Sequence, residues 1–125
     1  MHPLVDELLV LLRRHPLVRI IRVVTLDETP SGRLEVKLRC QLTGAYQLQI
    51  WLHREPAGLD YAFQLFTQQP VLRWDNAPHY PAIATAPHHF HDERGAVGVS
   101  PLSGEPLADL EILLHIVEMW LRPKG

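Results

Sequence analysis

The sequence predicts a single α+β domain in which a mostly antiparallel sheet of about five strands carries two helices on one face. Three observations support this fold class. Helical apolar patterns occupy both ends of the chain, alternating apolar and polar residues fill its middle, and turn residues separate the alternating segments. With 125 residues the chain can form one core but hardly two, so the domain is expected to span residues 1–125.

The two expected helices lie at the ends of the chain. Leucines recur at four-residue spacing over residues 4–12, which is the pattern of a helix with one apolar face, and His15-Pro16 ends this pattern. Near the other end, Ser103 or Glu105 is the expected N-cap, Pro106 falls in the first turn, and an apolar stripe follows to Leu121. Both helices are expected to lie on the sheet.

Five segments have the composition or alternation of strands, and the phase of the alternation fixes one turn. The strands are expected at residues 17–26, 34–42, 46–52, 59–65 and 71–75. A two-residue turn after Leu42 would place Cys40 opposite Gln47, whereas a three-residue turn over residues 43–45 places Cys40 opposite Leu48. Opposed residues share one face of a sheet, so the three-residue turn is predicted, with Cys40 buried.

Composition excludes several classes of protein. The net charge of −2 and the pI of about 6.4 give no overall positive field that would draw the molecule onto nucleic acid, so any such contact must be local. The lone Cys40 cannot form an intrachain disulfide and favours a reducing compartment, here the cytoplasm. The N-terminal segment lacks the basic start of a signal peptide, and no apolar run approaches the roughly 18 residues of a membrane span.

Residues 73–91 hold four of the eight histidines and three of the eleven prolines, a concentration found nowhere else in the chain. Prolines restrict the backbone and remove amide donors, so a stiff loop is expected here rather than a helix or a central strand. The candidate catalytic residues of this segment are Arg73, Asp75, His79, His88, His89 and His91. We expect them to gather in one shallow site at the end of the sheet.

Three interpretations of this segment stay open on the residues alone. In the first, two imidazoles act as general acid and base on RNA, Arg73 stabilises the charge on phosphorus, and Asn76 binds substrate. In the second, His89 and His91 bind a transition metal with Asp75 or Asp92 as a third ligand. In the third, the prolines and histidines form a structural loop that docks a partner protein or a second copy of the chain.

At these motifs the chain resembles the TumE-type family of toxin–antitoxin proteins. The matching runs are residues 14–16 (Arg-His-Pro), residues 73–79 (Arg-Trp-Asp-Asn-Ala-Pro-His) and residues 87–91 (Pro-His-His-Phe-His). Phe90 stands where lysine is common in the family, and Ala86 where phenylalanine often precedes Pro-His-His. The resemblance implies a toxin encoded beside a helix-turn-helix antitoxin and acting on RNA or translation.

The leading functional hypothesis is a toxin that cleaves RNA without a metal or other cofactor. Lys37 and Arg39 on the polar side of the second strand are candidates for guiding the RNA, although a simply solvated face is the favoured interpretation of these two residues. A non-catalytic interaction module, including a homodimer, and a small metal-dependent hydrolase are the competing functions.

Overall fold

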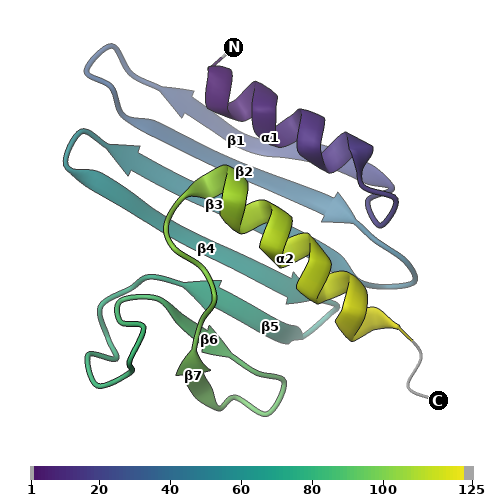
Figure 1. The fold of residues 1–125 in the computed structure, drawn as a ribbon. Coiled ribbons are helices and arrows are strands. Elements are labelled where there is room, and N and C mark those ends of the chain that lie inside the picture. The colour runs from purple at the N-terminus through teal and green to yellow at the C-terminus, as the bar shows by residue number, and fades with distance from the viewer. Residues whose placement is uncertain (1, 123–125) are drawn as a thin grey trace.

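The computed structural model describes residues 2–122 and contains two helices and seven strands. Their bounds are α1 Pro3–Arg14, β1 Ile20–Glu28, β2 Leu34–Gln41, β3 Gln47–Glu55, β4 Gly58–Phe66, β5 Pro70–Asp75, β6 His89–His91, β7 Val97–Val99 and α2 Pro106–Leu121. The strands follow one another across one antiparallel sheet in the order of the chain. Figure 1 shows this meander, which ends in two short strands beside β5.

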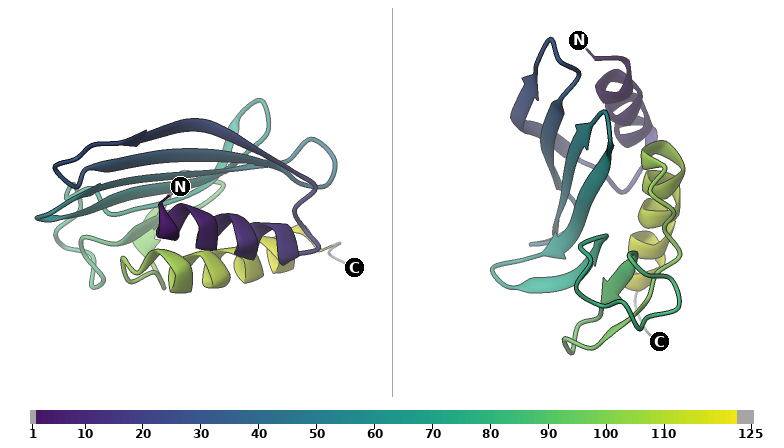
Figure 2. Two further views of the ribbon diagram at one scale, coloured as in Figure 1. Left: turned by 90° about the horizontal axis from the view of Figure 1, so that it is seen from above. Right: turned by 90° about the vertical axis from the view of Figure 1, so that its left-hand side faces the viewer.

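Both helices lie on the same face of the sheet, as the sequence predicts (Figure 2). Alternation in β2, β3 and β4 turns every second side chain toward the helices, where these side chains are buried. The core between the layers is almost wholly aliphatic and aromatic, with Trp74, Tyr61 and Phe63 as its largest fully buried side chains. The opposite face of the sheet carries polar and partly exposed side chains, and neither helix covers it.

The predicted three-residue turn is confirmed by the pairing of β2 with β3. Cys40 lies opposite Leu48 and Leu38 opposite Ile50, so the apolar faces of the two strands coincide. The Leu42 amide donates to the Tyr46 carbonyl across the turn at 3.0 Å. Gly44 takes the positive φ of 60° that lets the chain reverse here without a side-chain clash.

The expected strand count of about five is wrong, because β6 and β7 lie in a region assigned to loops. Of residues 73–91, only 76–88 form an irregular segment, while residues 89–91 form a strand between β5 and β7. All three prolines of this stretch precede the strand, so they leave its hydrogen bonds intact. The first strand also begins and ends later than expected, at Ile20 and Glu28.

The start of α2 is held by a carboxylate inside the helix rather than by its N-cap residue. Glu105 occupies the N-cap position but makes no side-chain capping bond. The buried Asp109 instead accepts hydrogen bonds from the Ser103 and Gly104 amides, each at 2.8 Å, and from the Ser103 hydroxyl at 3.0 Å. This carboxylate fixes the connection from β7 to α2.

No helix within residues 2–122 is both long and apolar enough to cross a membrane.

Cys40 should react slowly with thiol reagents in the native state. Its side chain is fully buried on the helix side of β2, and burial raises the pKa of the thiol to about 12. Thiols react as thiolates, so both access and ionisation oppose labelling. Labelling under native conditions, compared with the unfolded chain in denaturant, measures this protection. Equal rates in the two states would mean that the core face of β2 is assigned wrongly.

Candidate functional site

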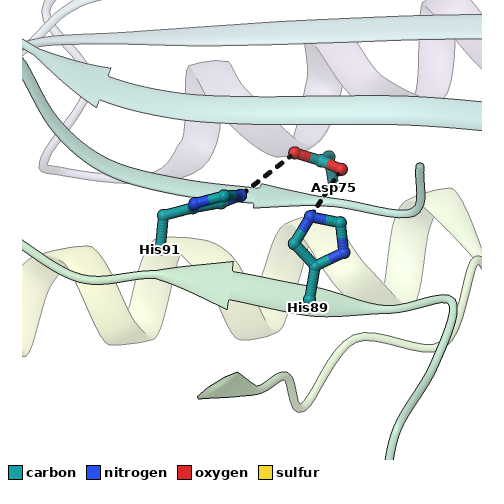
Figure 3. Close-up of side chains that lie close together, drawn as sticks. All are labelled: Asp75, His89 and His91. Atoms are coloured by element: carbon teal, nitrogen blue, oxygen red, sulfur yellow. Dashed lines mark ion pairs between the residues drawn. The ribbon is translucent and has the colours of Figure 1, made fainter. Parts of the chain in front are cut away.

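The pairing of β5 with β6 brings four polar side chains of the His-rich segment together at one end of the sheet. Asp75 lies opposite His89, and Arg73 lies opposite His91. These residues project from the face that the helices leave open, while Trp74 and Phe90 project into the core. Figure 3 shows Asp75 from β5 with both imidazoles of β6 turned toward it.

The Asp75 carboxylate is the centre of this group, and only 7% of its side chain is exposed. One oxygen, Oδ1, lies 2.9 Å from His89 Nε2 in an ion pair and accepts a hydrogen bond from the Ala77 amide at 3.0 Å. The other, Oδ2, accepts from Arg73 Nε at 2.8 Å and lies 3.7 Å from His91 Nε2. Such contacts fix the orientation of the buried carboxylate.

His89 is held at both ring nitrogens. Its side chain is 2% exposed, Nε2 faces Asp75, and Nδ1 lies 3.0 Å from the Pro87 carbonyl oxygen. A carbonyl oxygen only accepts hydrogen bonds, so Nδ1 is the donor to Pro87, while Nε2 faces the Asp75 carboxylate. Both ring nitrogens of His89 therefore face groups of the protein, and the ring is buried away from solvent.

His91 is the more accessible imidazole of the pair. Its side chain is 27% exposed, and its ring meets the His89 ring edge to face, with the ring centres 4.9 Å apart. Partial burial lowers the pKa of His91 below its ordinary value of 6.5; the Asp75 charge opposes this effect, and His89 and Arg73 add to it. His91 is therefore neutral at pH 7 and can accept a proton or donate a lone pair.

The lowered pKa of His91 should be visible in its NMR titration, with a midpoint below 6.5. Replacing Arg73 with glutamine removes a cation that disfavours the imidazolium, so the midpoint should then rise. The imidazole signals of the wild-type protein and of Arg73→Gln, followed over the same pH range, provide the measurement. A wild-type midpoint at or above 6.5 would contradict the burial of this ring.

Tyr80 is a residue of the site that sequence reasoning missed. Its ring packs on the rings of His89 and His91, with centres 4.7 and 5.8 Å apart. The side chain comes from the irregular segment after β5 and is itself 37% exposed. No local pattern in the sequence marks Tyr80, because its place beside the two imidazoles depends on the path of residues 76–88.

His88 does not join this group. Successive residues of an extended chain point to opposite faces, so His88 projects toward the helix side when His89 projects toward Asp75. Its Nδ1 lies 2.8 Å from the hydroxyl of the buried Tyr61, and the two rings stack with their centres 5.8 Å apart. His79 is exposed in a tight turn just before Tyr80. Among residues 2–122, the hydrogen bonds, ion pairs and ring contacts do not join the His79 side chain to Arg73, Asp75, His89 and His91, which we call the Asp75 group.

The other candidate residues take separate places. The side chain of Asn76 binds the backbone of β4 just after β5 ends. Its amide oxygen accepts from the Tyr61 backbone amide at 2.9 Å, and its amide nitrogen donates to the Leu59 carbonyl at 2.7 Å. Lys37 and Arg39 lie on the open face of β2, three strands away from β5. Asp92 binds the backbone of the β6–β7 turn through its Oδ1 atom.

Three atoms in the site have the arrangement of a metal-binding group. One ligand atom each from Asp75, His89 and His91 lies within 4.8 Å of the others. The carbonyl bonded to His89 Nδ1 is the outer partner that metal-binding histidines commonly have. The guanidinium of Arg73 on the same carboxylate, however, already supplies the positive charge that a metal would bring.

The family model described as Toxin TumE matches residues 8–122. The chain belongs to the TumE toxin family. Searches of the curated proteins and of the solved structures gave no match. TumE membership indicates a toxin of a toxin–antitoxin system and hence an antitoxin partner. The TumE match includes the whole Asp75 group and the strands that carry it.

Proposed function

We propose that this TumE-family toxin is a metal-independent ribonuclease and that His91 is its general base. The observation that carries the proposal is a partly exposed imidazole, with a pKa lowered by partial burial, that lies beside a buried carboxylate and an arginine. Neutral imidazole accepts a proton at physiological pH, and a guanidinium binds phosphate oxygens through paired donors. Both groups lie on the same open face of the sheet.

The proposed reaction is the attack of an RNA 2′-hydroxyl on the adjacent phosphate. His91 takes the hydroxyl proton at Nδ1, the ring nitrogen that does not face Asp75, while the O2′–P bond forms, and the bond between phosphorus and the 5′ oxygen then breaks. The 5′ oxygen leaves with a proton from a general acid. The products are a 2′,3′-cyclic phosphate and a 5′-hydroxyl, and no water or metal enters this step.

Arg73 is the proposed clamp for the phosphate. Its Nε atom is bound to Asp75, and 43% of its side chain is exposed. The Nε contact thus anchors the guanidinium to Asp75. The terminal nitrogens of Arg73 can then bind the phosphate oxygens as negative charge accumulates on them in the transition state. Asp75 and His89 act through Arg73 and His91 as positioning residues.

Two side chains of the irregular segment are candidates for the general acid. Tyr80 packs on the His91 ring, and the exposed His79 directly precedes it in the chain. Tyr80→Phe and His79→Ala separate them, because loss of the acid slows departure of the 5′ oxygen and removes the alkaline limb of the pH profile. His88 and Asn76 have structural partners and are not assigned to the reaction.

The proposed protein partner of the toxin is a helix-turn-helix antitoxin. The proposed location is the cytoplasm, which contains the proposed RNA substrate. A second copy of the chain is the alternative protein partner. Size-exclusion chromatography with light scattering, on the chain alone and with the product of the neighbouring gene, distinguishes a homodimer from a toxin–antitoxin complex.

Expression in cells tests the proposed activity. Wild-type protein should arrest growth and fragment cellular RNA, the antitoxin should restore growth, and His91→Ala should leave growth and RNA intact at equal protein level. If the folded wild-type protein fragments no RNA, the catalytic proposal fails, and the segment around His91 is then better described as a docking site for a partner.

A metal-dependent hydrolase is the second candidate, favoured by the carbonyl bonded to His89 Nδ1 and by the three clustered ligand atoms. In that case Asp75, His89 and His91 would hold a divalent ion such as Zn²⁺. The ion would supply a Lewis acid for the phosphate. Elemental analysis of purified protein, together with cleavage in the presence of a chelator, separates the two candidates.

A further inference from the structure

A hollow on the open face of the sheet adjoins the proposed catalytic group. Its volume is about 250 Å³. The lining residues include Trp51 on one side, Arg73 and Asp75 on the other, and Ala62 and Asp60 from β4 between them. Neither helix lies on this face of the sheet (Figure 2), so the hollow opens to solvent.

The register of the sheet explains why this hollow exists. Trp51 lies directly opposite Ala62, and Ala62 lies opposite Asp75. Three neighbouring strands thus place a large aromatic ring, a methyl group and a carboxylate in one row, and the methyl group leaves the space between the other two unfilled. Trp51 Nε1 donates to Glu35 Oε2 at 3.4 Å, which helps to fix the indole.

A second row of side chains, next to the first, contains only basic and amide groups from β1 to β6. Successive strands contribute Arg22, Arg39, Gln49, Gln64, Arg73 and His91, each opposite the next. With strands spaced about 4.8 Å apart, the row is about 24 Å long. It ends at the two residues proposed to bind and attack the phosphate, and its cations suit the backbone of a single strand of nucleic acid.

We propose that the hollow is a nucleobase subsite, in which a base next to the cleaved phosphate stacks on Trp51 over Ala62 while the RNA backbone follows the basic row. The inference rests on the proposed ribonuclease function and names its substrate as single-stranded RNA. Stacking on an aromatic side chain suits any base, and a duplex would keep its bases from reaching the ring.

The carboxylate of Asp60 adds a preference among bases. It is an exposed acceptor at the rim of the hollow, and within residues 2–122 no hydrogen bond or ion pair of its side chain is recorded. A carboxylate accepts from base amino and imino groups, and guanine presents two such donors side by side. Guanine is therefore the preferred base, and Asp60→Asn should reduce this preference.

Binding of a 2′-O-methyl RNA oligonucleotide tests the subsite without cleavage, because the methyl group blocks the attacking hydroxyl. Fluorescence anisotropy with a labelled oligonucleotide should show binding about 5- to 100-fold weaker for Trp51→Ala, the range expected for loss of one stacked base. Ala62→Leu, which fills the hollow, should weaken binding similarly. Trp51→Phe should retain most of the affinity, and Gln47→Ala, on the same face of β3 outside the hollow, should match wild type.

The inference is overturned if wild-type protein does not bind the oligonucleotide, or if Trp51→Ala and Ala62→Leu both bind as wild type does. Cleavage assays with the same variants test the subsite and the proposed chemistry separately. If Trp51→Ala and Ala62→Leu cleave RNA at the wild-type rate, the ribonuclease proposal is retained and the subsite is rejected. If oligonucleotide binding depends on both residues but the wild-type protein does not cleave unmodified RNA, the subsite is retained and the ribonuclease proposal is rejected.

Discussion

Replacing His91 with alanine is expected to slow RNA cleavage by about 10² to 10⁴-fold, the range that one general acid or base commonly contributes. The ring is partly exposed, so its loss should leave the fold intact. His91 is neutral at pH 7 because burial lowers its pKa, so it already works as a base there. The wild-type rate should therefore fall only at pH values below 6.5 on the acid side. Initial rates on a defined oligonucleotide measure both effects.

A matched histidine variant controls for this result. His115 is exposed on α2, on the helix side of the sheet, and His115→Ala should cleave at the wild-type rate. Cleavage by His91→Ala within a factor of three of wild type would remove His91 from the reaction, whatever the behaviour of the other histidines.

Replacing Asp75 with alanine is expected to lower the free energy of unfolding by about 3–5 kcal/mol, the usual effect of removing one partner from a buried ion pair. His89 would then stay buried without the carboxylate beside its Nε2 atom, and the Ala77 amide would lose its hydrogen bond. Arg73 would also lose its anchor, so cleavage should fall together with stability. Urea denaturation at pH 7 measures the change in stability.

The matched control for Asp75 is an aspartate without a buried partner. Asp27 is exposed near the end of β1, and Asp27→Ala should change the stability by less than about 0.5 kcal/mol. Asp75→Asn should fall between the two, since it keeps an acceptor for His89. A loss below about 1 kcal/mol for Asp75→Ala would mean that the pair behaves as a solvated surface contact.

Regular alternation made the centre of the sheet predictable. Leu38 and Cys40 share a face with Leu48 and Ile50 only if the turn has three residues, so the phase of two strands fixed their register. The strands β6 and β7 could not be found this way. Each has three residues, which is too short to show alternation, and the composition before β6 is that of a loop.

The candidate site was predictable in composition but not in arrangement. Arg73, Asp75, His89 and His91 come together because β6 pairs with β5, a contact that the sequence does not signal. The same pairing turns His88 to the other side, where it binds Tyr61. Consecutive residues of a strand point to opposite faces, so a strand at residues 89–91 would have predicted that His88 and His89 lie on different sides of the sheet.

Trp51 and Tyr80 illustrate a second limit. Each is isolated in the sequence and resembles an ordinary aromatic residue of a strand or a loop. Their places beside the Asp75 group depend on cross-strand neighbours and on the path of residues 76–88. Side chains that come together only through tertiary pairing carry no local signature. A cluster of histidines is visible in the sequence, whereas the functional place of a single aromatic residue is not.

The most direct test of the central claim is the chemistry of the RNA ends made by purified protein in the presence of a chelator. The account predicts that wild-type protein leaves 2′,3′-cyclic phosphate and 5′-hydroxyl ends, that the chelator does not change the rate, and that 2′-O-methyl RNA stays intact. No cleavage by folded protein, cleavage abolished by the chelator, or cleavage of 2′-O-methyl RNA would contradict attack by the 2′-hydroxyl with His91 as base.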